Sequence, residues 1–466
     1  MNTKFTTSRR TFLRTATTVA IAAPFFLENA MAGANAKKVR HACIGVGGMG
    51  AHDLQNFLSH PDIEIVALCD VDQAHLDQAA AILPNARTYT DWRVMLAAEK
   101  DNIDSVNVSV PDHNHFPIAL ASIQAGKHVY CQKPMCHDVA EVRKLTEAAI
   151  KAGVVTQLGT QHASSKGDRT GVMWLKERLI GKVKHVYLCS NRSGIDGYRL
   201  SGPRPAGGDP VPATLDWDKW IGTAPMRPYV KGIYHPGIWR TWLDFGTGWS
   251  GDIGCHIFDA VWKGLNLRAP LSVIASVQES WAQAADRRKD TWPQGNHIQW
   301  VFPGNDYTDK DTLPVEWFDG EFYPPEEVRA LFDVANYPEE AAMIIGTEGA
   351  LLIPHGGMPK LLPDAKFAQM SYPSLDERNH YHHYIDACLD RVETESHFAQ
   401  SGPMTEAILL GTVAIQVPGQ LLEWDAKNMR IRNYPAAEKH LKRTYRKGWE
   451  VDGFGRNPGH VLLPSR

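Results

Sequence analysis

Short apolar runs alternate with amphipathic segments through the first third of this chain. Runs of strand length, bounded by turn residues, occupy residues 39–44, 63–68, 105–110, 128–131 and 154–158. The segments between them repeat apolar residues at helical spacing and predict helices at residues 51–58, 74–83, 92–98, 116–125 and 139–152. Strands that alternate with helices build a parallel sheet with helices on both faces. The pattern therefore predicts an α/β domain over residues 37–160.

The pattern changes after about residue 160, where the chain becomes β-rich and irregular. We expect strands there at residues 184–189, 271–277, 297–302 and 350–353. Proline and glycine crowd residues 202–236, which is typical of long loops over a site. Residues 161–466 are therefore expected to form a second, α+β domain that binds the substrate.

A glycine-rich turn, Gly45-Val46-Gly47-Gly48-Met49-Gly50, joins the first predicted strand to the first helix. Glycines at this spacing allow a tight turn, close backbone approach to a pyrophosphate and close helix packing. Asp70 follows the second strand, and an acidic side chain there accepts a hydrogen bond from a ribose hydroxyl and repels a 2′-phosphate. The turn and the acid predict a Rossmann-type domain that binds NAD in preference to NADP.

Other polar residues follow the later strands of the same domain. Ligands of such sheets bind at the carboxyl ends of the strands. The chain places Asp112 and His113 at one such end and Gln132 and Lys133 at another. The expected cofactor contacts are therefore Gly45, Gly47, Gly48, Met49, Gly50, Asp70, Asp112, His113, Gln132 and Lys133.

The first 32 residues have the pattern of an export leader. Arg9 and Arg10 precede a short apolar stretch at residues 19–27, and Ala30-Met31-Ala32 fits a cleavage site. We expect a twin-arginine signal peptide over residues 1–32, read by the twin-arginine translocation machinery, and a periplasmic or secreted protein. The apolar stretch is shorter than the roughly twenty residues of a spanning helix, so we expect no stable membrane anchor. Outside the cytoplasm no nicotinamide pool exists, so the cofactor must travel tightly bound.

Composition narrows the remaining possibilities. The chain has 466 residues and a formal net charge of −3, which gives no sign of a nucleic-acid surface. Its seven cysteines are odd in number, and none forms a C-x-x-C pair. We therefore expect no disulfide framework and no metal site.

These motifs together resemble the Gfo/Idh/MocA (glucose-fructose oxidoreductase and inositol dehydrogenase) family. The glycine turn, the acid after the second strand, a Lys-Pro after a late strand and a downstream Asp-x-x-x-His match in order. The leader and the stretches at residues 215–218, 239–242 and 251–256 resemble a secreted, twin-arginine branch of that family. The resemblance implies that the second domain is an open, mostly antiparallel sheet with one face over the cofactor. One departure stands out, because the family usually has Glu-Lys-Pro and this chain has Gln132 before Lys133.

The resemblance also implies catalytic roles. Asp252 and His256 are four residues apart, on one face of a helix expected to begin near Asp252. Oxidation of an alcohol needs a base for the hydroxyl proton, and we expect His256 to be that base. Lys133 would stabilise developing alkoxide charge, and Asp252 would orient the histidine or bind a neighbouring hydroxyl. Trp239, Arg240 and Trp242 are the expected substrate contacts.

The sequence thus predicts an exported, NAD-dependent oxidoreductase that acts on a carbohydrate or polyol hydroxyl by hydride transfer to nicotinamide. One alternative is an NAD-dependent glycoside hydrolase, in which transient oxidation at sugar C3 allows elimination. A second alternative is a catalytically silent sugar-binding protein, which Gln132 mildly favours. A homo-oligomer is possible, since members of the family often pair through their sheet faces.

Overall fold

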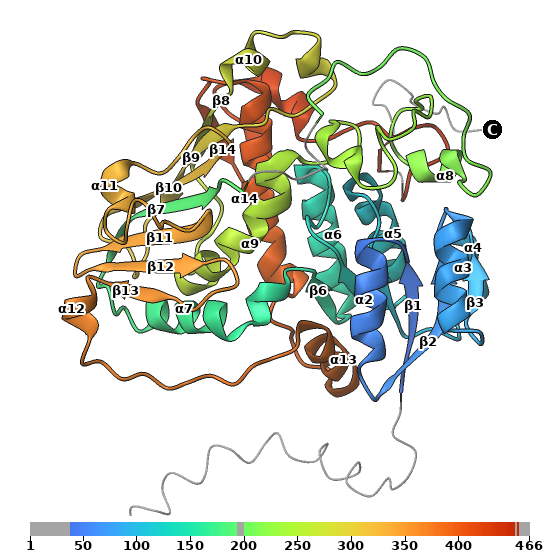
Figure 1. Ribbon diagram of the computed structural model, residues 1–466, viewed down its shortest axis with the longest axis horizontal. Helices are drawn as coiled ribbons and strands as arrows, with labels where there is room; N and C mark the ends of the chain where they lie inside the picture. Colours follow the sequence, from blue (N-terminus) through green and yellow to red (C-terminus); the bar gives the residue numbers. More distant parts are fainter. Residues whose placement is uncertain (1–37, 193–199, 453, 456–466) are drawn as a thin grey trace, which may run out of the picture. The chain divides into compact units, whose positions relative to one another are not determined.

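Six parallel strands form the first sheet, in the order β3-β2-β1-β4-β5-β6 (Figure 1). The structure is a computed structural model that describes residues 38–192, 200–452 and 454–455, so the expected leader lies outside the described residues. The strands are β1 (Val39–Ile44), β2 (Ile63–Cys69), β3 (Arg87–Tyr89), β4 (Ser105–Val108), β5 (His128–Cys131) and β6 (Thr156–Leu158). The helices between them are α2 (Met49–Leu58), α3 (Gln73–Ile82), α4 (Trp92–Ala98), α5 (His115–Gln124) and α6 (Val139–Ala152).

The predicted Rossmann-type alternation is confirmed, with differences at strand ends. The strand expected to reach residue 110 ends at Val108, and the one expected from residue 154 begins at Thr156. Strand β3 was not predicted, because this three-residue edge strand is mostly exposed and has no apolar run.

Helices cover both faces of this sheet. Residues of α4, α5 and α6 pack on the side of Ala42 and Ile44. Residues of α2 and α3 pack on the side of Val39 and Cys43. On that second side they are joined by α13 (His380–Asp390), which lies more than 200 residues later in the chain.

The second sheet has nine strands in the order β13-β12-β11-β7-β10-β9-β8-β14-β15. Its pairs are antiparallel except for β7 with β10, so the expected mostly antiparallel sheet is confirmed. The strands are β7 (Val183–Ser190), β8 (Ser272–Val277), β9 (Asn296–Pro303), β10 (Thr312–Asp319), β11 (Glu340–Gly346), β12 (Ala350–Pro354), β13 (Lys360–Leu362), β14 (Leu422–Asp425) and β15 (Arg430–Ile431).

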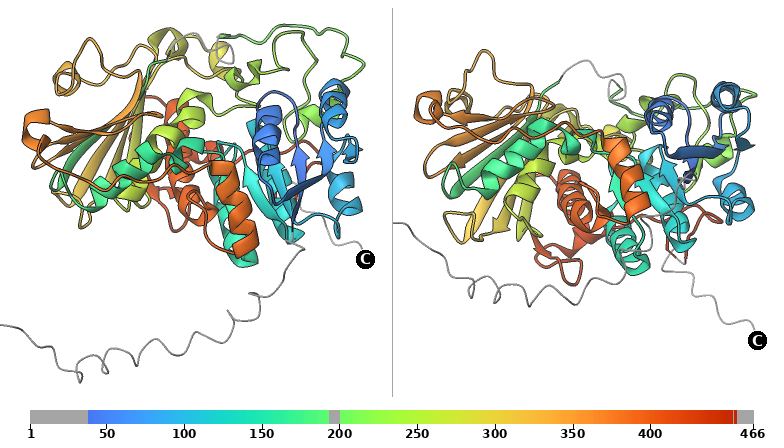
Figure 2. Two further views of the ribbon diagram at one scale, coloured as in Figure 1. Left: turned by 60° about the horizontal axis from the view of Figure 1, so that its bottom comes forward. Right: turned by 90° about the horizontal axis from the view of Figure 1, so that it is seen from below.

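Three longer helices contact this sheet: α7 (Lys166–Lys176), α9 (Gly248–Gly264) and α14 (Phe398–Gln416) (Figure 2). The shorter helices are α8 (Trp217–Ile221), α10 (Glu279–Ala282), α11 (Glu326–Arg329) and α12 (Asp364–Phe367), and 3-10 turns occupy Asp112–Asn114, Gln161–Ser164, Ile238–Thr241, Arg287–Lys289 and Pro435–His440. Within the described ranges, no helix combines the length and apolar character needed to cross a bilayer.

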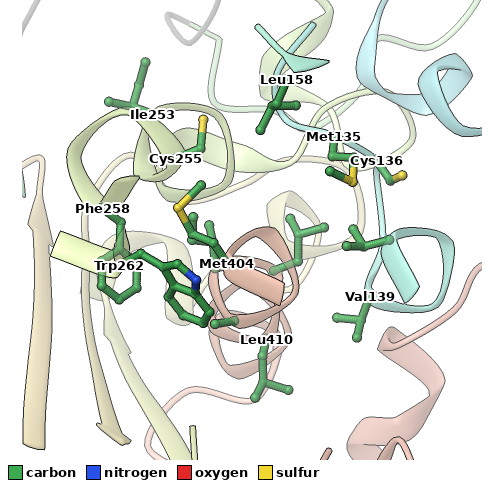
Figure 3. Packing of buried hydrophobic residues seen from close by; sticks show 14 of the residues in the cluster. Met135, Cys136, Val139, Leu158, Ile253, Cys255, Phe258, Trp262, Met404 and Leu410 are labelled. Atoms are coloured by element: carbon green, nitrogen blue, oxygen red, sulfur yellow. The ribbon is translucent and has the colours of Figure 1, made fainter. Parts of the chain in front are cut away.

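Helix α9 carries the expected catalytic pair and is anchored by a continuous apolar core. Figure 3 shows Cys255, Phe258 and Trp262 of α9 among the same buried residues as Met404 and Leu410 of α14. Met135, just after β5, belongs to the same cluster. Burial of apolar surface at about 25 cal/mol per Å² therefore fixes α9 relative to the end of β5. All seven cysteines are buried and unbridged, as the sequence indicated.

Candidate functional site

A cavity of about 400 Å³ lies at the carboxyl ends of β1, β2, β4 and β5. That volume is within the usual range for small-molecule and cofactor sites. Most of the expected cofactor contacts line it: Gly45, Gly47, Gly48, Met49, Asp70, Asp112, Gln132 and Lys133. Residues that follow the first domain in the chain close it, among them Lys219, Trp220, His235, Trp239, Arg240 and Trp449.

The glycine turn has the geometry that a dinucleotide needs. Gly48 has φ +50°, and a Cβ placed on it would meet nothing within 4 Å, so open space lies in front of the backbone before α2. Gly50 does not line the cavity, and a Cβ there would lie 2.1 Å from the carbonyl oxygen of Gly45. Gly48 thus leaves room for a ligand, whereas Gly50 allows the helix to pack closely on the strand.

Asp70 stands at the end of β2 with its carboxylate held by backbone. The amides of Val46 and Asp72 donate to its two oxygens at 2.8 and 2.9 Å. Each carboxylate oxygen can accept more than one hydrogen bond, so acceptor capacity remains toward the cavity that Asp70 lines. This placement suits a ribose hydroxyl, as expected from the sequence.

Gln132 is paired with a buried carboxylate that no sequence motif indicated. Its side-chain amide donates to both oxygens of Asp53, each at 2.9 Å. Ser109 and Tyr381 donate to the same carboxylate at 2.6 and 2.7 Å. Burial raises the pKa of Asp53, and the hydrogen bonds from these three side chains oppose that shift. The acidic group near position 132 is therefore Asp53 on α2. A glutamate at position 132 would be repelled by this carboxylate, whereas the amide of Gln132 binds it.

Lys133 meets the expected catalytic helix directly. Its Nζ donates to Oδ1 of Asp252 at 2.6 Å, and both side chains are largely buried. Nε of Arg240 lies 3.6 Å from Oδ2 of the same carboxylate. Two cations thus bracket one buried carboxylate beside the cavity, which holds the ammonium group of Lys133 in a fixed direction.

Asp112 adds a second carboxyl group to this cluster. It is buried in the cavity wall and accepts a hydrogen bond from Oγ1 of Thr247 at 3.1 Å. Burial, and then repulsion by Asp252, raises the pKa of Asp112 well above its ordinary value, while Arg240 and Lys133 oppose the rise. Asp112 is therefore easier to protonate than an exposed aspartate.

His256 lies one helical turn after Asp252, on a helix that begins at Gly248 and not near Asp252. The glycine-rich start of α9 obscured its first turn in the sequence, because glycine weakens a helical pattern. His256 is partly buried and its Nδ1 is fully enclosed without a hydrogen-bond partner among the described residues. Burial, and next the charge of Lys133, lowers the pKa of His256 well below its ordinary value. The imidazole is therefore neutral at neutral pH and able to accept a proton.

Besides Gly50, two of the expected contacts lie outside the cavity lining. His113 is fully buried behind the cavity wall, and its Nε2 lies 3.1 Å from the carbonyl oxygen of Trp220, so it positions chain segments and does not line the cavity. Trp242 is 1% exposed and donates from its indole nitrogen to the carbonyl oxygen of Ile233, so it belongs to an apolar core. Of the two tryptophans, Trp239 lines the cavity, with the guanidinium of Arg240 4.3 Å from its ring centre. Sequence spacing could not separate these neighbours because both are aromatic and close to Arg240.

Residues 214–240, the covering segment, are fastened to the first domain. The amide of Gln73 donates to the carbonyl oxygen of Thr214 at 2.8 Å. Nε2 of His235 lies 3.0 Å from Oδ2 of Asp72. These contacts hold the covering segment over the β2 side of the cavity.

Asp72, His75 and His235 also bring three possible metal-ligand atoms within 4.8 Å of one another. However, Nε1 of Trp220 lies 3.2 Å from Nδ1 of His235, and an indole nitrogen can only donate. Nδ1 of His235 is therefore an acceptor, and its proton is on Nε2, directed at Asp72. In that tautomer His235 ties the covering segment to Asp72 and offers Nε2 to no metal.

Comparisons with known proteins agree with this fold. Residues 39–160 match the model of the Gfo/Idh/MocA oxidoreductase family's NAD-binding Rossmann fold. Residues 189–329 match the model of the same family's C-terminal alpha/beta domain, so the two matches together cover more than half of the chain.

Curated relatives match over shorter stretches. The alpha-N-acetylgalactosaminidase of Bacteroides fragilis is 36% identical over 156 residues, which are 32% of this chain and 36% of that relative. The myo-inositol 2-dehydrogenase of Thermotoga maritima is 27% identical over 168 residues, which are 35% of this chain and 49% of that relative. The matched stretches thus span less than half of these relatives' own lengths.

Among solved structures, the WlbA dehydrogenase from Bordetella pertussis in complex with NADH and UDP-GlcNAcA is similar in fold. It superposes with a TM-score of 0.57 at 16% identity, over 83% of this chain and 99% of that one. At this identity the likeness concerns the fold alone.

Proposed function

We propose, on the premise that this chain belongs to the Gfo/Idh/MocA oxidoreductase family, that it is an exported enzyme with tightly bound NAD that oxidises a hydroxyl group of a carbohydrate or polyol. The observation that carries this proposal is the 2.6 Å contact between Lys133 and Asp252 beside the cavity, with His256 one turn further along α9. Alcohol oxidation needs a base for the hydroxyl proton and a positive charge near the oxygen. His256 provides the neutral base, and Lys133, held by Asp252, provides the fixed cation.

The residues of this chain have separable tasks in the proposed reaction. Bound NAD supplies the two-electron acceptor for the hydrogen on the substrate carbon. His256 takes the proton of the hydroxyl group, and Lys133 stabilises the negative charge that develops on its oxygen. Asp252 holds the ammonium group of Lys133 in place. The positive charge of Arg240 also lies close to the carboxylate of Asp252. Trp239 offers an apolar ring at the cavity wall for the C–H face of a sugar.

The covering segment supports tight retention of the dinucleotide. It lines the cavity with Lys219, Trp220 and His235, and it is bonded to the first domain on the β2 side. A ligand enclosed in this way leaves only after these contacts open. Retention suits an exported protein, and export itself rests on the twin-arginine pattern of residues 1–32.

A second candidate is an NAD-dependent glycosidase, in which oxidation is transient and no net redox change occurs. The relatives favour it, because they include the alpha-N-acetylgalactosaminidase of Bacteroides fragilis as well as several glycosyl hydrolase family 109 proteins. Both candidates use the same lysine, aspartate and histidine for the oxidation step.

One set of assays tests both. Protein purified in its folded state is denatured, and the released dinucleotide is identified; absence of NAD, even after folding with excess NAD, contradicts both candidates. Intact protein is then incubated with free sugars and polyols and with aryl glycosides. A 3-keto or other oxidised product indicates net oxidation, whereas release of the aryl group without an oxidised product indicates glycosidase activity.

A further inference from the structure

Three histidines, His256, His355 and His162, lie in a row. The row begins at His256 and ends at His162, which is partly exposed to solvent. The ring centre of His355, in the turn after β12, is 5.1 Å from that of His256. The ring centre of His162, in the turn after β6, is 4.4 Å from that of His355. The three residues come from three distant parts of the sequence, so only the tertiary structure brings them together.

The inner two rings have unused hydrogen-bonding capacity. Nδ1 of His256 and Nδ1 of His355 are both enclosed, and neither has a partner among the described residues. An enclosed polar atom without a partner is destabilising, so such atoms in a site call for a functional explanation. Two of them on neighbouring rings, which make no direct hydrogen bond to each other, fit a place where a proton passes through one bridging water molecule.

Burial and the neighbouring charges lower the pKa values of these histidines, so none of them retains a proton at neutral pH. Burial lowers the pKa of His355 to about 4, with further lowering by His162, Arg192 and Lys133. Burial also lowers the pKa of His162, while Glu340 acts in the opposite direction. A proton that enters at His256 is therefore repelled by Lys133 from the inner end and attracted by Glu340 at the outer end.

Local geometry holds the outer pair together. Gly356 follows His355 with φ +71°, and a Cβ on it would lie 2.9 Å from Cε1 of His162. Glycine at 356 thus lets the ring of His162 lie close to the turn that carries His355. The backbone amide of His355 donates to the carbonyl oxygen of Glu340 at 2.9 Å, which fixes that turn to β11.

We propose that His355 and His162 form a proton relay that carries the hydroxyl proton from His256 to solvent. This inference rests on the proposed oxidation. Per alcohol oxidised, the substrate carbon loses one hydrogen with two electrons to bound NAD, and the oxygen loses one proton to His256. Because Nδ1 of His256 is enclosed, Nε2 accepts that proton and Nδ1 releases one through a bridging water molecule to His355. His355 passes one on in the same way to His162, which releases it to solvent. A glycosidase that returns the proton to the same oxygen needs no such exit, so the relay serves net oxidation.

A kinetic test uses the holoenzyme and a sugar or polyol that the wild-type protein oxidises. His355→Asn is compared with wild type by absorbance of the reduced cofactor at 340 nm and by proton release to an indicator dye. We expect the maximal rate of cofactor reduction to fall at least tenfold with little change in KM, and added imidazole to restore part of it. A wild-type rate, or a tenfold rise in KM at unchanged maximal rate, overturns the relay. His162→Gln should give a smaller loss, and His185→Gln, on the nine-stranded sheet, is the matched control.

A second test needs no substrate and so separates the relay from the proposed function. Wild-type protein labelled with ¹⁵N in its histidine rings is examined by long-range ¹H–¹⁵N spectra. A shared proton gives the Nδ1 atoms of His256 and His355 resonances between those of protonated and unprotonated nitrogen, and His355→Asn removes this averaging at His256. If both rings are locked in single tautomers that share no proton, the relay is wrong whatever the substrate. If the averaging is present but no sugar is oxidised, the proposed function fails instead.

Discussion

Replacement of Gln132 by glutamate, the residue usual in the family, should destabilise this protein. The amide of Gln132 donates two hydrogen bonds of 2.9 Å to the buried carboxylate of Asp53. Gln132→Glu removes both donors and places a second carboxylate against Asp53. Hydrogen bonds to charged groups contribute roughly 1.5–3 kcal/mol each, and part of this loss is recovered when the two carboxyl groups share a proton. We therefore expect the free energy of unfolding to fall by about 3 kcal/mol at pH 7.5.

The loss should depend on pH in a defined direction. Burial already raises the pKa of Asp53, and a neighbouring glutamate raises the pKa of the shared proton further above its value in the unfolded chain. A group with a raised pKa in the folded state stabilises at low pH and loses that contribution as the pH rises through the folded-state pKa. The difference between Gln132→Glu and wild type should therefore shrink from pH 7.5 to pH 5.

The assay is urea unfolding followed by tryptophan fluorescence at the two pH values. The matched control is Asp53→Asn combined with Gln132→Glu, which exchanges the acid and the amide. We expect this double variant to recover most of the stability at pH 7.5, because one donor amide again faces one carboxylate. A single variant as stable as wild type at pH 7.5, or a double variant no better than the single one, would refute the pairing of Asp53 with Gln132.

Three further substitutions test other parts of the site. Lys133→Met should lower turnover at least 100-fold while the NAD content after purification stays unchanged, since the ammonium group held by Asp252 is the proposed stabiliser of charge on the reacting oxygen; turnover near wild type would exclude this role. Asp70→Asn should raise the proportion of NADP taken up from an equimolar mixture with NAD about tenfold, because the charge that repels a 2′-phosphate is removed; an unchanged proportion counts against Asp70 at the ribose. Trp242→Ala should lower the free energy of unfolding by about 3–5 kcal/mol through cavity formation, with Trp281→Ala as the comparison of a fully buried tryptophan that does not line the site. A stable Trp242→Ala variant with altered substrate affinity would instead return Trp242 to the substrate site.

The sequence by itself determined the first domain and much of its cofactor site. Apolar runs of strand length and helical periodicity are local properties, so they located β1, β2 and β5 and the helices between them. The glycine turn and Asp70 could be recognised from the sequence, because a dinucleotide requires a particular backbone conformation and an acidic side chain at these positions. Both line the cavity. The family resemblance indicated Lys133, Asp252 and His256 as one group. Spacing alone could not have shown that Lys133 contacts Asp252, because the two are 119 residues apart in the sequence.

The tertiary structure decided what depends on contacts between distant segments. It paired Gln132 with Asp53, placed Trp239 but not Trp242 in the cavity lining, and buried His113 behind the wall. It also brought His162, His256 and His355 into one row. Burial and partner geometry set the role of each polar or aromatic side chain, and both arise only when the sheets and helices pack, so no local pattern in the sequence encodes them.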